Sequence, residues 1–380
     1  MEKLVVKNCL YPALVDPDST QIFKNQFAFR PTGSTTAALI ALTHTIAELL
    51  VEHPFVHVIA LDLSKAFDTV RHSTLLEKCS NLPIGNGVHN WLVSYLDGRE
   101  HCTKFNGLVS NRQSINSSVV QGSGIGPMAY VINASDYRPR YRETRVIMYA
   151  DDCYLVITSA NSKRVRDEID HVAIWAEANN LKLNKAKTQE LIVRKRGCQH
   201  APEIPKPLED VTRVDTLKVL GVLLQGDLSF REHVKHVSNQ CAQANYALRT
   251  LRAHGLAGSE LWQVTQSTLV AKATYASQAW WGMLDAGNRQ QMENIVSKAI
   301  KQGFLPADHI GLAATCDQAD MTLFSAILKN SNHVLHQFLP PIKATNYDLR
   351  ARVHNRTIPM VKDTLLRKTF IIRMIYKDSF

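Results

Sequence analysis

The sequence lacks the features of a membrane or secreted protein. No uninterrupted apolar run reaches the roughly 18 residues that a spanning helix needs, and the first residues, MEKL, hold no apolar core of a signal peptide. The seven cysteines are scattered singly, without Cys-x-x-Cys or the Cys/His spacing of a zinc site. We therefore expect a protein without membrane contact, inside the cell in the nucleus, the cytoplasm or both, with reduced thiols and no structural zinc.

The two common nucleotide-binding fingerprints are also absent. Residues 121–127 hold three glycines, yet they match neither the P-loop nor the dinucleotide pattern. Glycine this dense lets a backbone approach a ligand closely, and a helix beginning after it would favour phosphate at its N-terminus. A flexible loop that leads into a helix is the alternative on local grounds.

The charge balance points to a polyanionic partner. The 380 residues carry a net charge of +10, and the isoelectric point is near 9.2. A basic protein attracts phosphates and gains from the release of their counterions, although a basic balance can also serve solubility alone. The length suggests two or three domains or subdomains.

A pair of carboxylates lies between two β-type runs at residues 146–157. The pattern predicts a β-hairpin whose two-residue turn is Asp151 and Asp152. Such turns favour glycine, because their central residues often need a positive φ. Two aspartates break that local rule, and a divalent metal that takes a third carboxylate from elsewhere would explain them. Taken alone, a solvated Asp-Asp turn is the commoner explanation.

The third carboxylate follows a buried strand. Residues 56–61 form a nearly continuous β-type run that ends at Asp62, the position at which α/β-type sheets place reactive groups. Asp62 with Asp151 and Asp152 supplies the ligands for two Mg²⁺ ions about 3.5–4 Å apart, which catalyse in-line phosphoryl displacement. In a basic protein, this chemistry points to nucleic acid as the substrate.

Periodicity predicts the other elements. We expect helices that begin at Thr35 and near residues 88 and 165, a hairpin or extended connection over residues 99–118, and strands over residues 191–193 and 219–224. After about residue 227 the apolar spacing is that of a helical unit.

Five motifs occur in the order and rough spacing of reverse transcriptases. They are residues 62–68 (DLSKAFD), 121–123 (QGS), 149–152 (YADD), 183–188 (LNKAKT) and 220–222 (LGV). The sequence most resembles the enzymes of non-LTR retrotransposons of the LINE, jockey-like type, and residues 26–30 resemble their fingers motif. The resemblance implies an α+β right-hand polymerase, with palm and partial fingers over residues 1–224. An all-helical thumb would follow over residues 225–300, and a basic C-terminal extension over residues 301–380.

The resemblance also implies roles for the acidic residues and for one aromatic residue. Asp62 and Asp151 would ligate both Mg²⁺ ions, for which Mn²⁺ is a possible substitute, and Asp152 would support the site. Phe67 matches the steric gate that rejects a ribose 2′-hydroxyl and so selects deoxynucleotides. The alternative is an ordinary core phenylalanine at the end of a strand.

Further residues match substrate-binding positions of the family. Gln121 and Gly122 would lie against the incoming nucleotide and the template, and Lys187 would assist the departure of pyrophosphate. Arg30 would lie in the fingers with a weaker claim to substrate contact. The implied partners are an RNA template, a DNA primer or target and deoxynucleoside triphosphates, and the oligomeric state is not indicated.

Two alternatives stay open. The fingers hairpin expected upstream of Met1 is missing, which allows a truncated, catalytically inactive remnant that only binds nucleic acid. An RNA-dependent RNA polymerase or a metal nuclease could share the acidic geometry. Phe67 and the YADD motif argue against the first of these enzymes, and residues 121–122 argue against the second.

Overall fold

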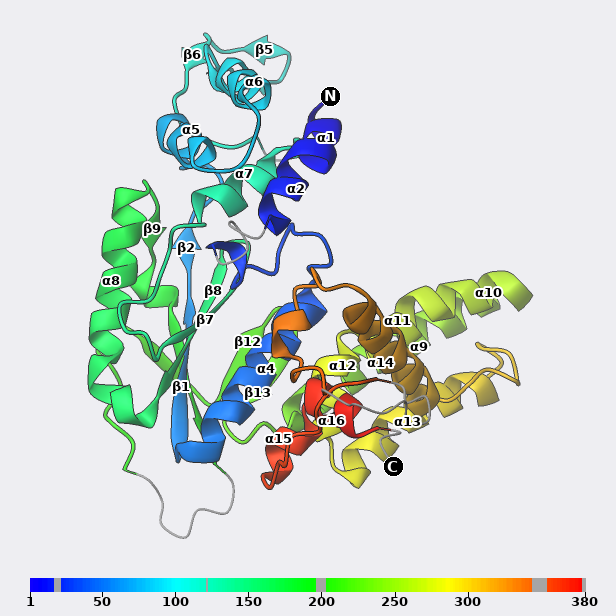
Figure 1. The fold of residues 1–380 in the computed structure, drawn as a ribbon. Coiled ribbons are helices and arrows are strands. Elements are labelled where there is room, and N and C mark those ends of the chain that lie inside the picture. The colour runs from blue at the N-terminus through cyan, green and yellow to red at the C-terminus, as the bar shows by residue number, and fades with distance from the viewer. Residues whose placement is uncertain (17–21, 121, 196–202, 344–353, 378–380) are drawn as a thin grey trace. The chain divides into compact units, whose positions relative to one another are not determined.

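The structure, a computed structural model, describes residues 1–16, 22–120, 122–195, 203–343 and 354–377 (Figure 1). The chain forms two compact units. Unit 1 comprises residues Met1–Ser34, Ile59–Gln189 and Pro205–Thr212, and unit 2 comprises Thr35–Val58, Glu190–Ile204 and Arg213–Phe380. The two units interleave along the chain, whereas the segments predicted from the sequence are continuous.

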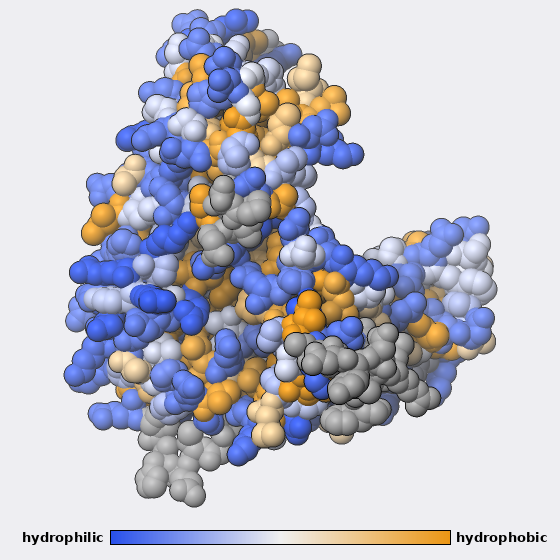
Figure 2. Space-filling model, viewed as in Figure 1, coloured by the Kyte–Doolittle hydropathy of each residue, from blue (hydrophilic) through white to orange (hydrophobic). Residues whose placement is uncertain are grey.

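The sheet of unit 1 is built on one hairpin. Strand β7 (Arg145–Tyr149) pairs antiparallel with β8 (Asp152–Thr158), and β8 also neighbours β1 (Phe55–Leu61), whose last three residues belong to this unit. Buried residues of these strands pack on α8 (Val165–Ala178), which presents apolar residues at helical spacing. The surface over α8 is mostly hydrophilic in Figure 2. The predicted strand over residues 56–61 and the predicted helix near residue 165 are confirmed.

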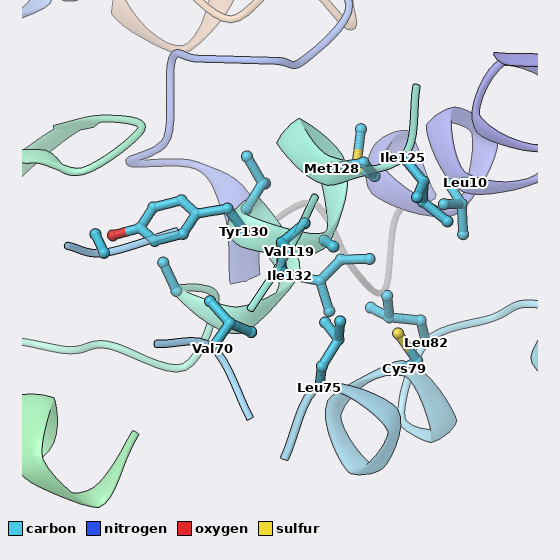
Figure 3. Packing of buried hydrophobic residues seen from close by; sticks show 14 of the residues in the cluster. Leu10, Val70, Leu75, Cys79, Leu82, Val119, Ile125, Met128, Tyr130 and Ile132 are labelled. Atoms are coloured by element: carbon cyan, nitrogen blue, oxygen red, sulfur yellow. The ribbon is translucent and has the colours of Figure 1, made fainter. Parts of the chain in front are cut away.

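A second core of unit 1 lies among helices. It joins α5 (His72–Ser80), α6 (Asn86–Leu96) and α7 (Gly126–Asn133) to an N-terminal helical segment made of α1 (Glu2–Val5), η1 (Val6–Leu10) and α2 (Tyr11–Val15). Figure 3 shows this core, in which Leu75 of α5 faces Ile132 of α7. An apolar cavity of about 300 Å³ opens in the core, but neither Asp62 nor the Asp151-Asp152 pair lines it.

Short elements complete unit 1. They are β2 (Leu63–Ser64) paired with β9 (Lys182–Leu183), β3 (Glu100–His101) paired with β6 (Gln113–Ser114), β4 (Lys104–Phe105) paired with β5 (Leu108–Val109), and the 3-10 helices η2 (Ser159–Arg164) and η3 (Lys185–Lys187). The predicted hairpin within residues 99–118 is confirmed.

Unit 2 begins with a long apolar helix, α4 (Thr35–Glu52). By length and composition α4 could cross a membrane, although the sequence showed no uninterrupted apolar run of that length. In the structure, however, 67% of α4 is buried. It packs on other helices of the same unit, as the core helix of a globular protein does. The predicted helix that begins at Thr35 is confirmed.

The strands of unit 2 form a sheet edge and a hairpin. Strand β10 (Gln189–Arg194) lies between β11 (Thr212–Val214) and β1, and β12 (Thr216–Val219) pairs with β13 (Val222–Gln225). The prediction of one strand over residues 219–224 is therefore wrong. Leu220 and Gly221 form a two-residue turn with φ of 45° and 87°, and the freedom of glycine at positive φ explains the break.

The rest of unit 2 is helical, as the sequence predicted for residues after about 227. The elements are α9 (Arg231–Ala253), α10 (Gly258–Thr265), η4 (Gln266–Val270), α11 (Ala271–Thr274), α12 (Ser277–Trp280), η5 (Trp281–Met283), α13 (Ala286–Lys301), α14 (Leu312–Lys329), η6 (His336–Phe338), α15 (Thr364–Lys368) and α16 (Phe370–Tyr376).

Candidate active site

Asp62 lies between two strands of unit 1. It follows the last residue of β1 and precedes β2, and its side chain is half-buried. The backbone carbonyl of Asp62 accepts a hydrogen bond from the N–H of Asn184 at 2.8 Å. This bond and the β2–β9 pairing bring the 183–188 motif beside Asp62, although some 120 residues separate them in the sequence.

The acidic hairpin has a turn that differs from the predicted one. Tyr149 pairs with Asp152, so the two turn residues are Ala150 and Asp151, and Asp152 is the first residue of β8. The prediction of an Asp151-Asp152 turn is therefore wrong by one residue. Ala150 has a φ of 55°, so the residue in the left-handed region, where glycine is favoured, is an alanine. Asp151 lies exposed at the tip.

Two of the carboxylates act electrostatically on the third. Partial burial, then the charge of Asp151 and then that of Asp62 raise the pKa of Asp152 from 3.8 to about 6. A carboxylate shifts upward in this way when like charges lie nearby. No lysine or arginine in the described part of the chain forms an ion pair with any of the three carboxylates. The charges of Asp151 and Asp62 both act on Asp152, so the three carboxylates lie in the same region of unit 1.

This donor set suits a hard divalent cation in its chemistry. Carboxylate oxygens are the ligands that Mg²⁺ prefers, and mutually repelling carboxylates without a protein cation gain from one. Among the described residues, however, no three His, Cys, Asp or Glu side chains converge tightly enough to hold a metal ion. The residue types fit the metal, and no coordination geometry follows from their positions.

Phe67 contacts Tyr130, a residue near the acidic turn. Its ring stacks on that of Tyr130 with 4.6 Å between centroids and 26° between planes, and its carbonyl accepts a hydrogen bond from the N–H of Val119 at 2.9 Å. Burial, and after it the charge of Asp151, raise the pKa of the Tyr130 hydroxyl, so this residue is near the acidic turn. Phe67 is half-buried at the edge of the helical core, a position compatible with both of its predicted roles.

The glycine-rich segment leads into α7, as predicted. Gln121 lies outside the described residues, and Gly122 is exposed with a φ of 87°. The carboxylate of Glu2 accepts hydrogen bonds from the N–H groups of Gly124 at 2.6 Å and Ile125 at 3.2 Å. An anionic group therefore already sits at the N-terminus of α7, where the sequence suggested phosphate.

The two predicted basic contacts differ in their surroundings. Lys187 is exposed at the end of η3, and its backbone N–H donates to Oδ1 of Asn184. Arg30 is buried, with 8% of its surface exposed, and its Nη1 donates to the carbonyls of Phe23 at 2.5 Å and Gln26 at 3.3 Å. Burial lowers the pKa of Arg30 to about 10. In this structure Arg30 braces its own segment from within.

Sequence reasoning missed a role for Gln26. This residue is 2% exposed, and its Oε1 accepts hydrogen bonds from the N–H groups of Ala28 at 2.9 Å and Ala150 at 3.1 Å. The flanking backbone reinforces the contact, because the N–H of Met148 donates to the carbonyl of Asn25 at 2.8 Å. Gln26 thus ties the acidic turn to a segment 124 residues earlier. The only signal in the sequence was that Gln26 begins the segment that resembles the family's fingers motif, and it gave no indication of this contact.

The chain is similar to one known family and to several known proteins. Residues 1–224 match the family described as reverse transcriptase (RNA-dependent DNA polymerase). The chain is 26% identical over 295 residues to a probable RNA-directed DNA polymerase from transposon X-element of Drosophila melanogaster, a match covering 73% of the chain and 32% of that protein. It is 25% identical over 245 residues to an RNA-directed DNA polymerase from mobile element jockey of Drosophila funebris, covering 62% of the chain and 26% of that protein.

These relatives are much longer proteins. The chain spans less than a third of the length of either one. Among solved structures, a telomerase from Candida tropicalis in complex with a fragment of telomeric RNA aligns with a TM-score of 0.42 and 12% identity, over 88% of the chain and 50% of the telomerase. A likeness at this level supports no assignment.

Proposed function

The chain belongs to the reverse transcriptase family and resembles the LINE, jockey-like members of it. From this membership we propose that the chain adds deoxynucleotides to the 3′-hydroxyl of a primer on an RNA template. The observation that carries the proposal is the raised pKa of Asp152 in unit 1, to which the charges of Asp151 and Asp62 both contribute after partial burial. Three carboxylates without a protein counter-charge are a costly arrangement for the fold. A polymerase that binds divalent cations gives that arrangement a purpose.

The three acidic residues would have different roles in the site. Asp62 and Asp151 would hold two Mg²⁺ ions, or Mn²⁺ in their place, and Asp152 would support them from the start of β8. When bound, the ions supply charge neutralisation at the primer oxygen and at the departing pyrophosphate. The β7–β8 hairpin and the end of β1 fix the backbone positions of the three carboxylates.

Other residues would select and hold the nucleotide. Phe67 is braced by Tyr130 and would present its ring edge to the sugar, where a 2′-hydroxyl meets steric resistance. Gln121 and Gly122 would lie against the nucleotide and template, and the exposed Lys187 is free to reach the pyrophosphate. Arg30 would act indirectly, because its guanidinium is held by backbone carbonyls of its own segment.

The partners would be an RNA template, a DNA primer or target and deoxynucleoside triphosphates. We assign the palm and part of the fingers to residues 1–224, the thumb to residues 225–300 and a basic extension to residues 301–380. The run of helices from α9 onward supports a helical thumb in character. The net charge of +10 agrees with nucleic acid as the partner.

Primer extension tests the function. The whole chain, a labelled DNA primer on an RNA template, dNTPs and Mg²⁺ should give template-dependent product that EDTA abolishes. Asp151→Ala should abolish it too, while Asp97→Asn, which removes an exposed carboxylate after α6, should leave it unchanged. Absence of product from both the wild type and Asp151→Ala, at saturating Mg²⁺ and dNTP, would refute the polymerase function and favour an inactive chain that only binds nucleic acid.

A further inference from the structure

A regular hairpin stands on the surface of unit 1, between α6 and α7. Its two ladders join Glu100 to Ser114 and Lys104 to Val109, and every strand residue in them is exposed. Asn106 and Gly107 form the turn with φ of 46° and 80°, which is the preferred chemistry for a two-residue hairpin turn. Figure 1 shows β5 and β6 beyond α5 and α6, away from the sheet of this unit. The turn residues therefore define this hairpin, although none of its strand residues is buried.

The tip of this hairpin exposes two large apolar side chains. Phe105 and Leu108 pair directly across the ladder, so their side chains share one face. Phe105 is 74% exposed and Leu108 is 78% exposed. Neither side chain contributes to a core, and apolar groups gathered on a surface commonly mark a binding site. We call Phe105 and Leu108 the apolar tip.

We propose that the apolar tip binds a nucleic-acid strand, with Phe105 stacked on an unpaired base and Leu108 supporting the ring from the opposite strand. This inference rests on the proposed function, in that it presumes a chain that handles RNA and DNA. It adds a contact outside the acidic site and assigns it to residues that none of the five motifs includes. Aromatic side chains stack on any base, so the contact would be independent of sequence.

The charges around the tip favour this partner. Residues 99–114 hold three cationic side chains and one carboxylate; Arg112 pairs with Glu100 at 3.7 Å and Arg99 lies over the Tyr95 ring, which leaves Lys104 as the cation nearest the tip. Lys104 precedes Phe105 directly and is exposed. Consecutive residues of a strand point to opposite faces, so Lys104 lies on the face opposite the Phe105 ring, and its long side chain would contact a phosphate of the strand whose base stacks on that ring. A combination of aromatic and cationic side chains is the usual means of binding single strands.

The size of the tip argues against a protein partner. A stable protein interface buries about 800 Å² on each side, whereas two side chains at the end of a two-stranded hairpin offer only a fraction of that. One exposed aromatic ring suffices for a stacking contact with a base. A protein docked on the tip is the alternative that the experiment must exclude.

Binding is measured with the full chain and a fluorescein-labelled single-stranded RNA of about 20 nucleotides, by anisotropy at several salt concentrations. Phe105→Ala should raise Kd by roughly tenfold, since stacking on one base has about that effect. Phe105→Trp should restore binding. Ile174→Ala, which truncates an exposed apolar side chain on α8 of the same unit, should change nothing.

The salt dependence separates stacking from charge. Phe105→Ala should leave the slope of log Kd against log salt unchanged, whereas Lys104→Gln should reduce the slope by about one phosphate contact. If Phe105→Ala binds the RNA as tightly as the wild type does, the inference is wrong while primer extension can still establish the polymerase. If the wild type binds no RNA at all, both are wrong. An effect of Phe105→Ala that Phe105→Trp fails to rescue would also overturn the stacking contact.

Discussion

Replacing Gln26 by methionine removes the amide oxygen that ties the β7–β8 hairpin to the segment at residues 25–30 of unit 1. That oxygen accepts hydrogen bonds from the N–H groups of Ala28 and Ala150, at 2.9 and 3.1 Å. Ala150 is the first residue of the turn and precedes Asp151 directly. Methionine has a similar volume and no strong acceptor, so the packing is retained while both hydrogen bonds are lost.

The magnitude follows from two opposing effects. Each lost hydrogen bond reduces stability by about 1 kcal/mol, which gives roughly 2 kcal/mol for the pair. The Nε2 of Gln26, however, is buried and has no partner among the described residues, so its removal relieves a desolvation cost of about 1 kcal/mol. We expect the free energy of unfolding to fall by about 1–2 kcal/mol. Catalysis should fall further, by about 10- to 100-fold, because a small displacement of a catalytic group is enough for such a loss.

Three measurements check this prediction. Urea denaturation gives the stability, primer extension gives the rate, and hydrogen exchange followed by mass spectrometry reports on the Ala150 amide. Gln290→Met, at an exposed position on α13, is the matched control and should behave as the wild type in all three. If exchange at Ala150 is as slow in Gln26→Met as in the wild type, Gln26 does not hold the turn and the reasoning fails.

Two further substitutions test single side chains. Phe67→Ala removes the ring stacked on Tyr130, so it should lower the free energy of unfolding by about 2 kcal/mol and raise ribonucleotide incorporation at least tenfold. Competition assays measure the sugar discrimination. If the discrimination is unchanged, Phe67 is an ordinary core residue. The second substitution is at Glu190, which is buried and hydrogen-bonded to His57 and to Arg213, each at 2.7 Å. Burial alone would raise the pKa of Glu190, but these two hydrogen bonds outweigh burial and hold the pKa below its ordinary value of 4.5. A lowered pKa stabilises the fold above pH 4.5, and this contribution is lost as the pH falls, so Glu190→Gln should lower stability by about 2 kcal/mol at pH 7, with a smaller difference in urea titrations near pH 3. An equal difference at both pH values would show that the charge of Glu190 is not the cause.

The elements of the fold were largely predictable because their signals are local. The spacing of Val165, Ile169 and Val172 predicted α8, and the unbroken apolar run before Asp62 predicted a strand buried on both faces. The turn at Leu220 and Gly221 was readable too, since a glycine inside an apolar run often marks a break. The prediction of one strand over residues 219–224 was wrong because it followed the apolar run and disregarded Gly221.

The site was predictable in its residues and less so in its geometry. The acidic turn is displaced by one residue because hairpin register depends on which residues pair across the strands, and the sequence of one strand does not reveal that. The contact of Gln26 with Ala150 spans 124 positions, and nothing local to either residue announces it. The carboxylate of Glu2 at the start of α7 is equally remote in sequence from Gly124. Such long-range contacts follow from tertiary packing alone.

Burial and charge repulsion at Asp152 lead to one more prediction, in which function and stability oppose each other. The pKa of Asp152 is raised from 3.8 to about 6, so the fold disfavours the ionised form of this carboxyl. A group that binds its proton more tightly in the fold than in the unfolded chain reduces stability above both pKa values. The neutral variant Asp152→Asn should therefore be more stable than the wild type in metal-free buffer at pH 8. Allowing for screening by solvent at the hairpin end, we expect a gain of about 1 kcal/mol.

The pH dependence of that gain identifies its origin. The advantage of Asp152→Asn should be full above pH 6 and should vanish below about pH 4, where the wild-type carboxyl is protonated in both the folded and the unfolded state. Mg²⁺ at millimolar concentration should stabilise the wild type more than the variant, because the cation relieves the same repulsion among the carboxylates. Urea denaturation at pH 4, 6 and 8 measures all of this without reference to activity. A variant that is less stable than the wild type at pH 8 would mean that neither burial nor the neighbouring carboxylates disfavour the ionised form of Asp152, and the argument for a cation site in unit 1 would lose its physical basis.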